Sequence, residues 1–229
     1  MLRSVKQYFA DVIKGGIELL FPPLCFNCNE KLTDDEKVIC TKCWLEIALL
    51  PDHILSKKHK GEYIDQLDSL WLFDETFQKI VHLLKYSNCR SIGMQIGCFM
   101  GNYLKENSLA DLENSVLVPV PLHPVKKRER GYNQAELIAN GISEVTGIDV
   151  NTNLVTRVKN TATQTKMNRK ERIENMKDAF AAVGKTDNKT VIIIDDVYTT
   201  GTTINSVAEE IRRNNKAITT VAFSAAMPE

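Results

Sequence analysis

The stretch VIIIDDVYTTGTT, residues 191–203, decides how this chain is expected to fold. It begins with four β-branched apolar residues, which is the pattern of a strand buried on both faces of a parallel sheet. The apolar run stops abruptly at Asp195 and Asp196, and a polar loop with a single glycine follows. Because ligands of open α/β sheets bind at the carboxyl ends of the strands, this stretch predicts a binding loop.

The loop TTGTT, residues 199–203, has the composition of a phosphate site. Its glycine allows a close backbone approach, and the surrounding amides and hydroxyls converge on an anion at the start of a helix. The two adjacent carboxylates before it repel each other unless ribose hydroxyls or a metal ion face them. The alternative is a strand, a turn and a threonine-capped helix without a ligand. The whole string favours a sugar phosphate, and the residues expected to contact it are Asp195, Asp196, Thr199, Thr200, Gly201, Thr202 and Thr203.

Strand and helix patterns alternate along much of the chain before and after this stretch. The alternation predicts an α/β fold with a mostly parallel sheet flanked by helices on both faces. The expected strands are 69–73, 115–120, 154–158, 179–183, 190–195 and 217–224, and the expected helices are 75–86, 91–106, 133–145 and 203–214.

A basic segment, VPVPLHPVKKRERGYNQAELIA at 118–139, joins a strand end to a helix through a turn stiffened by prolines. Clustered lysines and arginines after a stiff turn suit a pyrophosphate, whose charge needs several donors held at fixed distances. A solvated basic loop is the alternative. The candidates are His123, Lys126, Arg128 and Arg130, with Lys85 near the end of a helix as a weaker one.

A second basic segment covers residues 157–180. We expect its first part to be mobile and able to close over a bound sugar phosphate, which would exclude water. An amphipathic helix whose apolar side chains pack is a compatible alternative. The residues expected to reach the site are Arg157, Lys159, Thr161 and Gln164.

Four of the six cysteines form the pattern C-x2-C-x11-C-x2-C, at Cys25, Cys28, Cys40 and Cys43. Each C-x2-C pair directs two thiolates at one point, and two pairs close a tetrahedron around Zn²⁺. Such a closed site has no vacancy for a substrate, so the expected role of the zinc is structural. The alternatives are an iron–sulfur cluster and free cysteines in a core.

The composition is that of an ordinary folded protein, with 29 basic and 29 acidic residues among 229. Charged residues interrupt the apolar positions of the first 24 residues, which are therefore expected to form an amphipathic helix and not a signal peptide. No apolar stretch is long enough to span a bilayer. We therefore expect a cytoplasmic protein without a transmembrane segment and with reduced cysteines.

The stretch VIIIDDVYTTGTT resembles the phosphoribosyl pyrophosphate loop of type I phosphoribosyltransferases. The resemblance implies that Asp195 and Asp196 bind the 2′- and 3′-hydroxyls of ribose, and that residues 199–203 hold the 5-phosphate. It also implies Mg²⁺ as the cofactor that accompanies phosphoribosyl pyrophosphate. No general base is evident in the sequence, so the catalytic residues stay unassigned.

Four motifs in order, namely the cysteine pairs, the segment 118–139, the segment 157–180 and the loop 191–203, resemble the ComF family of late-competence proteins. Residues 51–65 are polar and basic and are expected to form a linker, between an N-terminal helix with the zinc ribbon at 1–50 and a phosphoribosyltransferase-like domain at 66–229. The resemblance implies a cytoplasmic protein that helps single-stranded DNA enter the cell during natural transformation. The implied partners are a ComF helicase and other competence proteins, which would bring it to the inner face of the membrane.

Two other functions remain open from the sequence. One is an active phosphoribosyltransferase of nucleotide salvage or amidotransfer. The other is a module that binds single-stranded DNA through its basic segments, although no aromatic residue is interleaved with the basic runs to stack on bases.

Overall fold

The structure is a computed structural model, and it describes residues 21–34, 36–55, 61–107, 111–159, 178–187, 189–215 and 217–229. The chain divides into two compact units, the first ending at Ile47 and the second beginning at Ala48. The expected N-terminal helix and residues 160–177 of the second basic segment lie outside the described residues.

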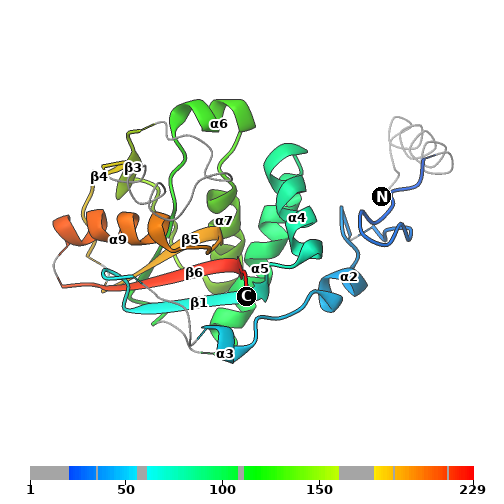
Figure 1. Cartoon of the computed structure of the whole chain (residues 1–229), viewed down its shortest axis with the longest axis horizontal. Helices are drawn as coiled ribbons and strands as arrows, with labels where there is room; N and C mark the ends of the chain where they lie inside the picture. Colours follow the sequence, from blue (N-terminus) through cyan, green and yellow to red (C-terminus); the bar gives the residue numbers. More distant parts are fainter. Residues whose placement is uncertain are drawn as a thin grey trace, which may run out of the picture. The chain divides into compact units, whose positions relative to one another are not determined.

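The second unit is built on a four-stranded sheet with the strand order β1-β6-β5-β2, in which every neighbouring pair is parallel (Figure 1). Its strands are β1 (Gln66–Leu72), β2 (Ser115–Pro119), β5 (Thr190–Val197) and β6 (Thr219–Met227). A small antiparallel pair consists of β3 (Val155–Arg157) and β4 (Phe180–Ala182). The prediction of an α/β fold with a mostly parallel sheet is therefore confirmed.

Helices pack on both faces of this sheet. Among the described residues of this unit they are α3 (Asp52–Leu55), α4 (Glu75–Tyr86), α5 (Arg90–Glu106), α6 (Pro124–Arg130), α7 (Gln134–Thr146) and α9 (Thr202–Asn214). Val191 and Ile193 share a buried cluster with the apolar side of α9. The next position, Ile194, pairs with Phe223, whose ring stacks on Tyr103 of α5 on the opposite face. This alternation of side chains along β5 explains why its apolar run is uninterrupted.

The helices α4, α5 and α7 lie side by side (Figure 1). Two glycines, Gly97 of α5 and Gly141 of α7, make the close approach of their helices possible. A Cβ atom on Gly97 would collide with the carbonyl oxygen of Ile138, and one on Gly141 with that of Met94. The glycines therefore let two backbones touch on one face of the sheet.

The helix α6 was not expected, because the sequence analysis assigned only a stiff turn to this part of the segment 118–139. His123 caps its first turn by accepting a hydrogen bond from the backbone N–H of Val125, and Pro124 occupies the start of the helix. Gly131 ends it in the left-handed conformation, with φ of 80°. Proline at the start and glycine after the end are typical helix boundaries, which could have identified this helix.

The first unit is small, and its described part contains one helix, α2 (Thr41–Glu46). Cys40 caps this helix through its sulfur, which accepts a hydrogen bond from the backbone N–H of Cys43. The buried side chains of its described part are those of Leu32, Ile39, Trp44, Ile47 and three cysteines, Cys25, Cys40 and Cys43, whereas Cys28 is exposed. These described apolar side chains alone give a small domain little stability. A metal or another cross-link is therefore expected to stabilise it.

Candidate functional site

The acidic pair, Asp195 and Asp196, lies at the carboxyl end of β5, next to the end of β2. The backbone N–H of Asp196 donates to Oδ1 of Asp195 at 2.9 Å, and that of Val197 donates to Oδ1 of Asp196 at 3.0 Å. Asp196 is buried. A buried carboxylate is costly unless a positive charge or hydrogen-bond donors compensate it, so the surroundings of the pair matter.

Lys85, in the last turn of α4, supplies a compensating charge. Its ammonium nitrogen lies 2.5 Å from Oδ2 of Asp196, and both side chains are mostly shielded from solvent. The hydroxyl of Tyr132 donates to the carbonyl oxygen of Leu84, which ties the end of α4 to the segment after α6. Lys85 was only a weaker candidate in the sequence, and the structure places it directly on the acidic pair.

The charged groups of the site shift one another's pKa values. Burial, and next the carboxylate of Asp196, raise the pKa of Asp195 to about 8 against the opposing effect of Lys85. Burial lowers the pKa of Lys85, but the charge of Asp196, the hydrogen bond to it and the charge of Asp195 together outweigh this effect, so the net pKa is raised and the ammonium stays charged. Burial also lowers the pKa of Arg157, against the attraction of Asp195. The charge of Asp195 therefore acts on the guanidinium of Arg157, which lies on β3.

The loop after β5 forms a small pocket together with Asp195 and the first residues of α9. Gly201 adopts the left-handed conformation, with φ of 72°, and a Cβ atom there would collide with the hydroxyl of Tyr198. Tyr198 is buried beneath the loop, and its backbone N–H donates to the carbonyl oxygen of Ala226 at 2.9 Å. The tyrosine and the glycine together fix the shape of the loop, which is why the loop requires glycine at this position.

The start of α9 leaves backbone donors available in this pocket. The residue before the helix is Gly201, so no side chain caps the first turn. The hydroxyls of Thr200 and Thr202 lie 3.0 Å apart, so they face the same region. An uncapped helix start, flanked by hydroxyls and favoured by the helix dipole, can bind a phosphate group.

The helix α6 gives the four candidates of the first basic segment different degrees of exposure and different contacts. Arg130 faces inward, because it hydrogen-bonds to Gln134, lies 5.8 Å from the ring of Tyr86 and acts on the charge of Lys85. Arg128 is exposed and Lys126 is half-buried. His123 uses its Nδ1 as an acceptor in the cap, which leaves the proton of the neutral ring on Nε2.

The structure therefore brings together the acidic pair, the loop 199–203, Arg130 and Arg157, and it adds Lys85. Gln164 and Thr161 lie outside the described residues, and Lys159 forms an exposed ion pair with Asp178. Tyr198 was not predicted to have a role, although it lies within the stretch 191–203. A tyrosine next to a glycine-containing loop was the available signal, because a glycine often marks a close approach.

The four cysteines of the first unit gather at one point. Their sulfur atoms all lie within 4.8 Å of one another, with 3.8 Å between Cys25 and Cys43 and 3.7 Å between Cys28 and Cys40. These separations exceed the length of a disulfide bond, about 2.05 Å. A tetrahedron with Zn–S bonds of about 2.3 Å has edges of about 3.8 Å, so the cluster has the size of a metal site.

Hydrogen-bond donors surround the same sulfur atoms. The backbone N–H of Cys40 donates to the sulfur of Cys25 at 3.3 Å, and the side-chain amide of Asn27 donates to that of Cys43 at 3.4 Å. Burial opposes ionisation of Cys25, but the backbone donors outweigh it and lower the pKa of this thiol to about 6. Thiolates are the form that binds metals, so this cluster could hold an ion such as zinc.

Comparison with known proteins adds to this geometry. Residues 118–227 match the phosphoribosyl transferase domain family. DNA utilization protein YhgH of Escherichia coli O6:H1 is 32% identical over 215 residues, which cover 87% of this chain and 95% of that protein. Competence protein F of Haemophilus influenzae is 29% identical over 82% of this chain and 90% of its own length. Competence protein ComFC of Bacillus subtilis is 23% identical over 95% and 90%, respectively.

The fold and the site define a phosphoribosyltransferase-type domain preceded by a four-cysteine cluster. No helix among the described residues is long and apolar enough to cross a membrane. Because the similarity to the competence proteins extends over both units, the chain belongs to the ComF family. It is therefore a competence-related protein with a phosphoribosyltransferase fold.

Proposed function

We propose that the second unit, which we expected as a domain at 66–229, binds phosphoribosyl pyrophosphate or a related phosphosugar together with Mg²⁺. The observation that carries this proposal is the loop at the end of β5. It joins two carboxylates, which can accept hydrogen bonds from ribose hydroxyls, to an uncapped helix start suited to a 5-phosphate. The threonines 199, 200, 202 and 203 would add hydroxyl donors to the phosphate.

The carboxylate oxygens of the acidic pair also fit the hard oxygen ligands that Mg²⁺ prefers. Bound Mg²⁺ would neutralise part of the charge of the pyrophosphate. The chain's own contribution is to hold Asp195 and Asp196 by backbone N–H donors, so that the hydroxyl-accepting oxygens are in place before the ligand arrives. His123 can donate from Nε2, and Lys126, Arg128, Arg130, Arg157 and Gln164 are proposed as further phosphate contacts.

Isothermal titration calorimetry with Mg²⁺ and phosphoribosyl pyrophosphate tests this function. The variant Asp195→Asn, Asp196→Asn should bind at least about tenfold more weakly, because hydrogen bonds to charged groups are strong. Asp149→Asn, Asp187→Asn is the matched control, since both of its residues are exposed and it makes the same two aspartate-to-asparagine changes. Equal affinities of the wild type and the site variant would refute the site as drawn.

We further propose that the four cysteines bind structural zinc. The support is the size of the sulfur tetrahedron and the N–H donors around it. An all-thiolate site of this kind is closed, so the metal would stabilise the first unit and would not contact a substrate.

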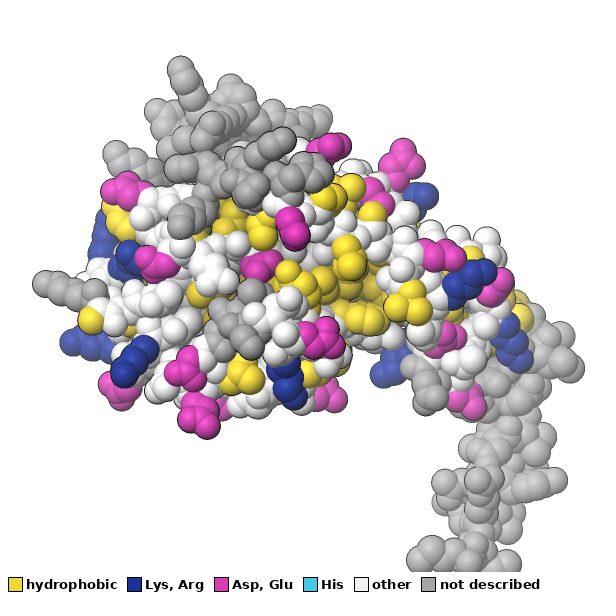
Figure 2. Space-filling model, turned by 90° about the horizontal axis from the view of Figure 1, so that it is seen from below, with side chains coloured by type: hydrophobic (Ala, Val, Ile, Leu, Met, Phe, Trp, Pro, Cys, Tyr) yellow, Lys and Arg dark blue, Asp and Glu magenta, His cyan; other side chains and the backbone are white. Residues whose placement is uncertain are grey.

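The proposed cellular role is to assist the handling of single-stranded DNA during its uptake. The printed names of the relatives concern competence and DNA utilization, which supports this role. On the face seen in Figure 2, described basic and acidic side chains are interspersed. The exposed basic residues of α6 follow the carboxyl end of β2. There the exposed ring of Tyr86 lies beside Arg130. The tertiary structure thus places an aromatic ring next to the basic helix, which the sequence alone did not show.

A further inference from the structure

Lys85 comes from a helix that the loop motif does not include, yet its ammonium is in direct contact with the acidic pair. Its ammonium lies 2.5 Å from Asp196, and 24% of its side chain is exposed. The ion pair thus holds the ammonium beside the acidic pair, and part of the side chain remains exposed. A buried ion pair beside a binding loop is a candidate for recognition of an anion.

The chemistry of a ribose phosphate determines which group would face this cation. If the 5-phosphate lies on the loop 199–203, the hydroxyls on C2 and C3 lie on the acidic pair. With the C2 hydroxyl on Asp196, the substituent on C1, the ring carbon next to C2, would lie towards Lys85, which is paired with Asp196. A diphosphate on C1 brings negative charge to that place, whereas the free hydroxyl of ribose 5-phosphate does not.

The other basic residues near this end of the sheet are less suited to that contact. Lys127 forms an ion pair with Glu136 at 2.8 Å, and Arg128 is exposed on α6. Arg130 does face Lys85, but its guanidinium is already engaged by Gln134 and the ring of Tyr86. Of Lys85, Lys127, Arg128 and Arg130, Lys85 is the one in direct contact with the acidic pair.

We propose that Lys85 binds the C1 diphosphate and thereby determines the preference of the site for a sugar 1-diphosphate 5-phosphate over a sugar 5-phosphate. This inference rests on the proposed function. The ammonium of Lys85 would move from Asp196 to the diphosphate or would contact both. If it moves, the positive charge of Arg130 would remain near the place that Lys85 has left.

A purely structural role of Lys85 predicts a different change in the affinities of the two ligands. If Lys85 only positions Asp196, its loss disturbs the acidic pair, which both ligands use equally. Ribose 5-phosphate and phosphoribosyl pyrophosphate would then lose affinity by the same factor. Comparing the two ligands in one variant therefore separates contact with the C1 group from support of the carboxylate.

The experiment is calorimetric titration of the full chain with each ligand in the presence of Mg²⁺. Lys85→Met should weaken phosphoribosyl pyrophosphate by about tenfold or more, because a charge-assisted contact is lost, and should change ribose 5-phosphate by less than about twofold. Lys85→Arg should keep most of the preference. Lys79→Met, on an exposed position of the same helix, should change neither affinity.

Equal losses for both ligands in Lys85→Met, or no loss at all, would overturn the inference while leaving the proposed function intact. A wild-type chain that binds neither ligand would overturn the proposed function and this inference with it. Circular dichroism of each variant verifies the fold, and Lys85→Gln carries the same comparison if the methionine variant does not fold.

Discussion

Asp195 is the residue whose protonation links the site to the stability of the fold. Burial and the adjacent Asp196 raise its pKa to about 8, whereas an aspartate in an unfolded chain has a pKa of about 3.9. Between these values the folded chain holds a proton that the unfolded chain has released. The stability linked to this proton is complete below about pH 4 and is lost as the pH rises through about 8.

The variant Asp195→Asn should lack this loss, because an amide does not titrate. Chemical denaturation between about pH 6 and pH 9 should therefore show the wild type losing stability relative to the variant, by at most about 1.4 kcal/mol per pH unit for one proton. The exposed Asp149→Asn should follow the wild type. Parallel curves for wild type and Asp195→Asn would show that Asp195 is already ionised at pH 6.

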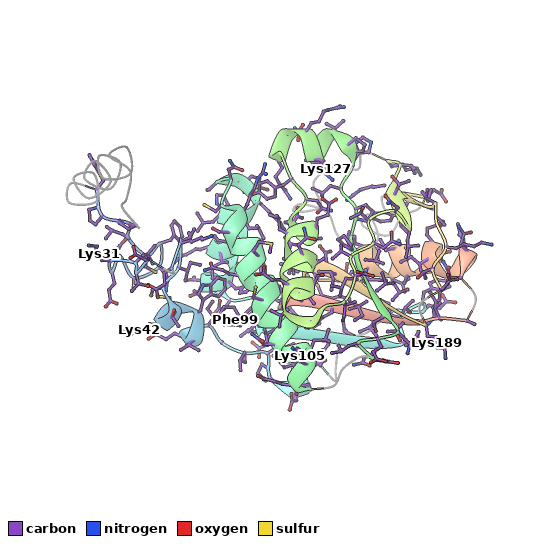
Figure 3. All side chains as sticks on the ribbon, turned by 180° about the vertical axis from the view of Figure 1, so that it is seen from behind. Lys31, Lys42, Phe99, Lys105, Lys127 and Lys189 are labelled. Carbon is purple, nitrogen blue, oxygen red and sulfur yellow. The ribbon has the colours of Figure 1, made fainter. Side chains whose placement is uncertain are left out.

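The helix α6 is the element whose orientation separates its basic residues into two groups. Arg130 lies on the side of α6 towards Lys85, which contacts the acidic pair, while Lys127 and Arg128 are exposed. Figure 3 shows Lys127 on α6 at the top of the view, and Lys105 and Lys189 far from it near the bottom. Removal of charge at these separate places should therefore affect a bound polyanion differently.

Single-stranded DNA binding should depend on the exposed residues of α6. Lys127→Gln, Arg128→Gln should weaken binding of a labelled oligothymidylate and reduce the slope of log affinity against log salt by about 0.7 per lost phosphate contact. Lys105→Gln, Lys189→Gln removes the same charge far from α6 and should leave the slope unchanged. Fluorescence anisotropy over a KCl series measures both. Equal changes in the two variants would argue against α6 as the DNA-binding element.

At the scale of the whole molecule, the two units depend on different sources of stability. The second unit has an extensive apolar core between its sheet and helices, whereas the described part of the first unit is organised around four cysteines. Metal binding to such sites contributes roughly 10–16 kcal/mol, which is comparable with the entire stability of a small domain. Loss of the metal should therefore unfold the first unit before the second.

Removal of metal tests this difference. Metal analysis should find about one zinc per chain in the wild type and none in Cys43→Ser, while Cys98→Ser, on α5, keeps the metal. Chelation should expose buried Trp44 and shift its emission to longer wavelength, a change that Trp44→Phe lacks. Retained binding of phosphoribosyl pyrophosphate after chelation would agree with the independent core of the second unit. A chain that carries no zinc, or a Cys98→Ser variant without it, would contradict the assignment.

Features encoded in short stretches could be predicted from the sequence. The strand, acidic pair and glycine loop at 191–203 follow one another directly, and the two C-x2-C pairs have a spacing that brings their sulfur atoms together. The alternation of strand and helix patterns was sufficient to predict a parallel sheet. Individual boundaries were less accurate, since β1 begins at Gln66 and β6 extends to Met227.

Residues that are close in the chain, or that repeat with a regular period, were thus enough to predict the α/β class, the loop at 191–203 and the four-cysteine cluster. The contact of Lys85 with Asp196, the inward direction of Arg130 and the position of Tyr86 beside Arg130 became visible in the tertiary structure. These contacts depend on how α4 and α6 pack around the ends of β2 and β5. No local pattern contains that packing, because it results from the burial of apolar side chains over the whole unit.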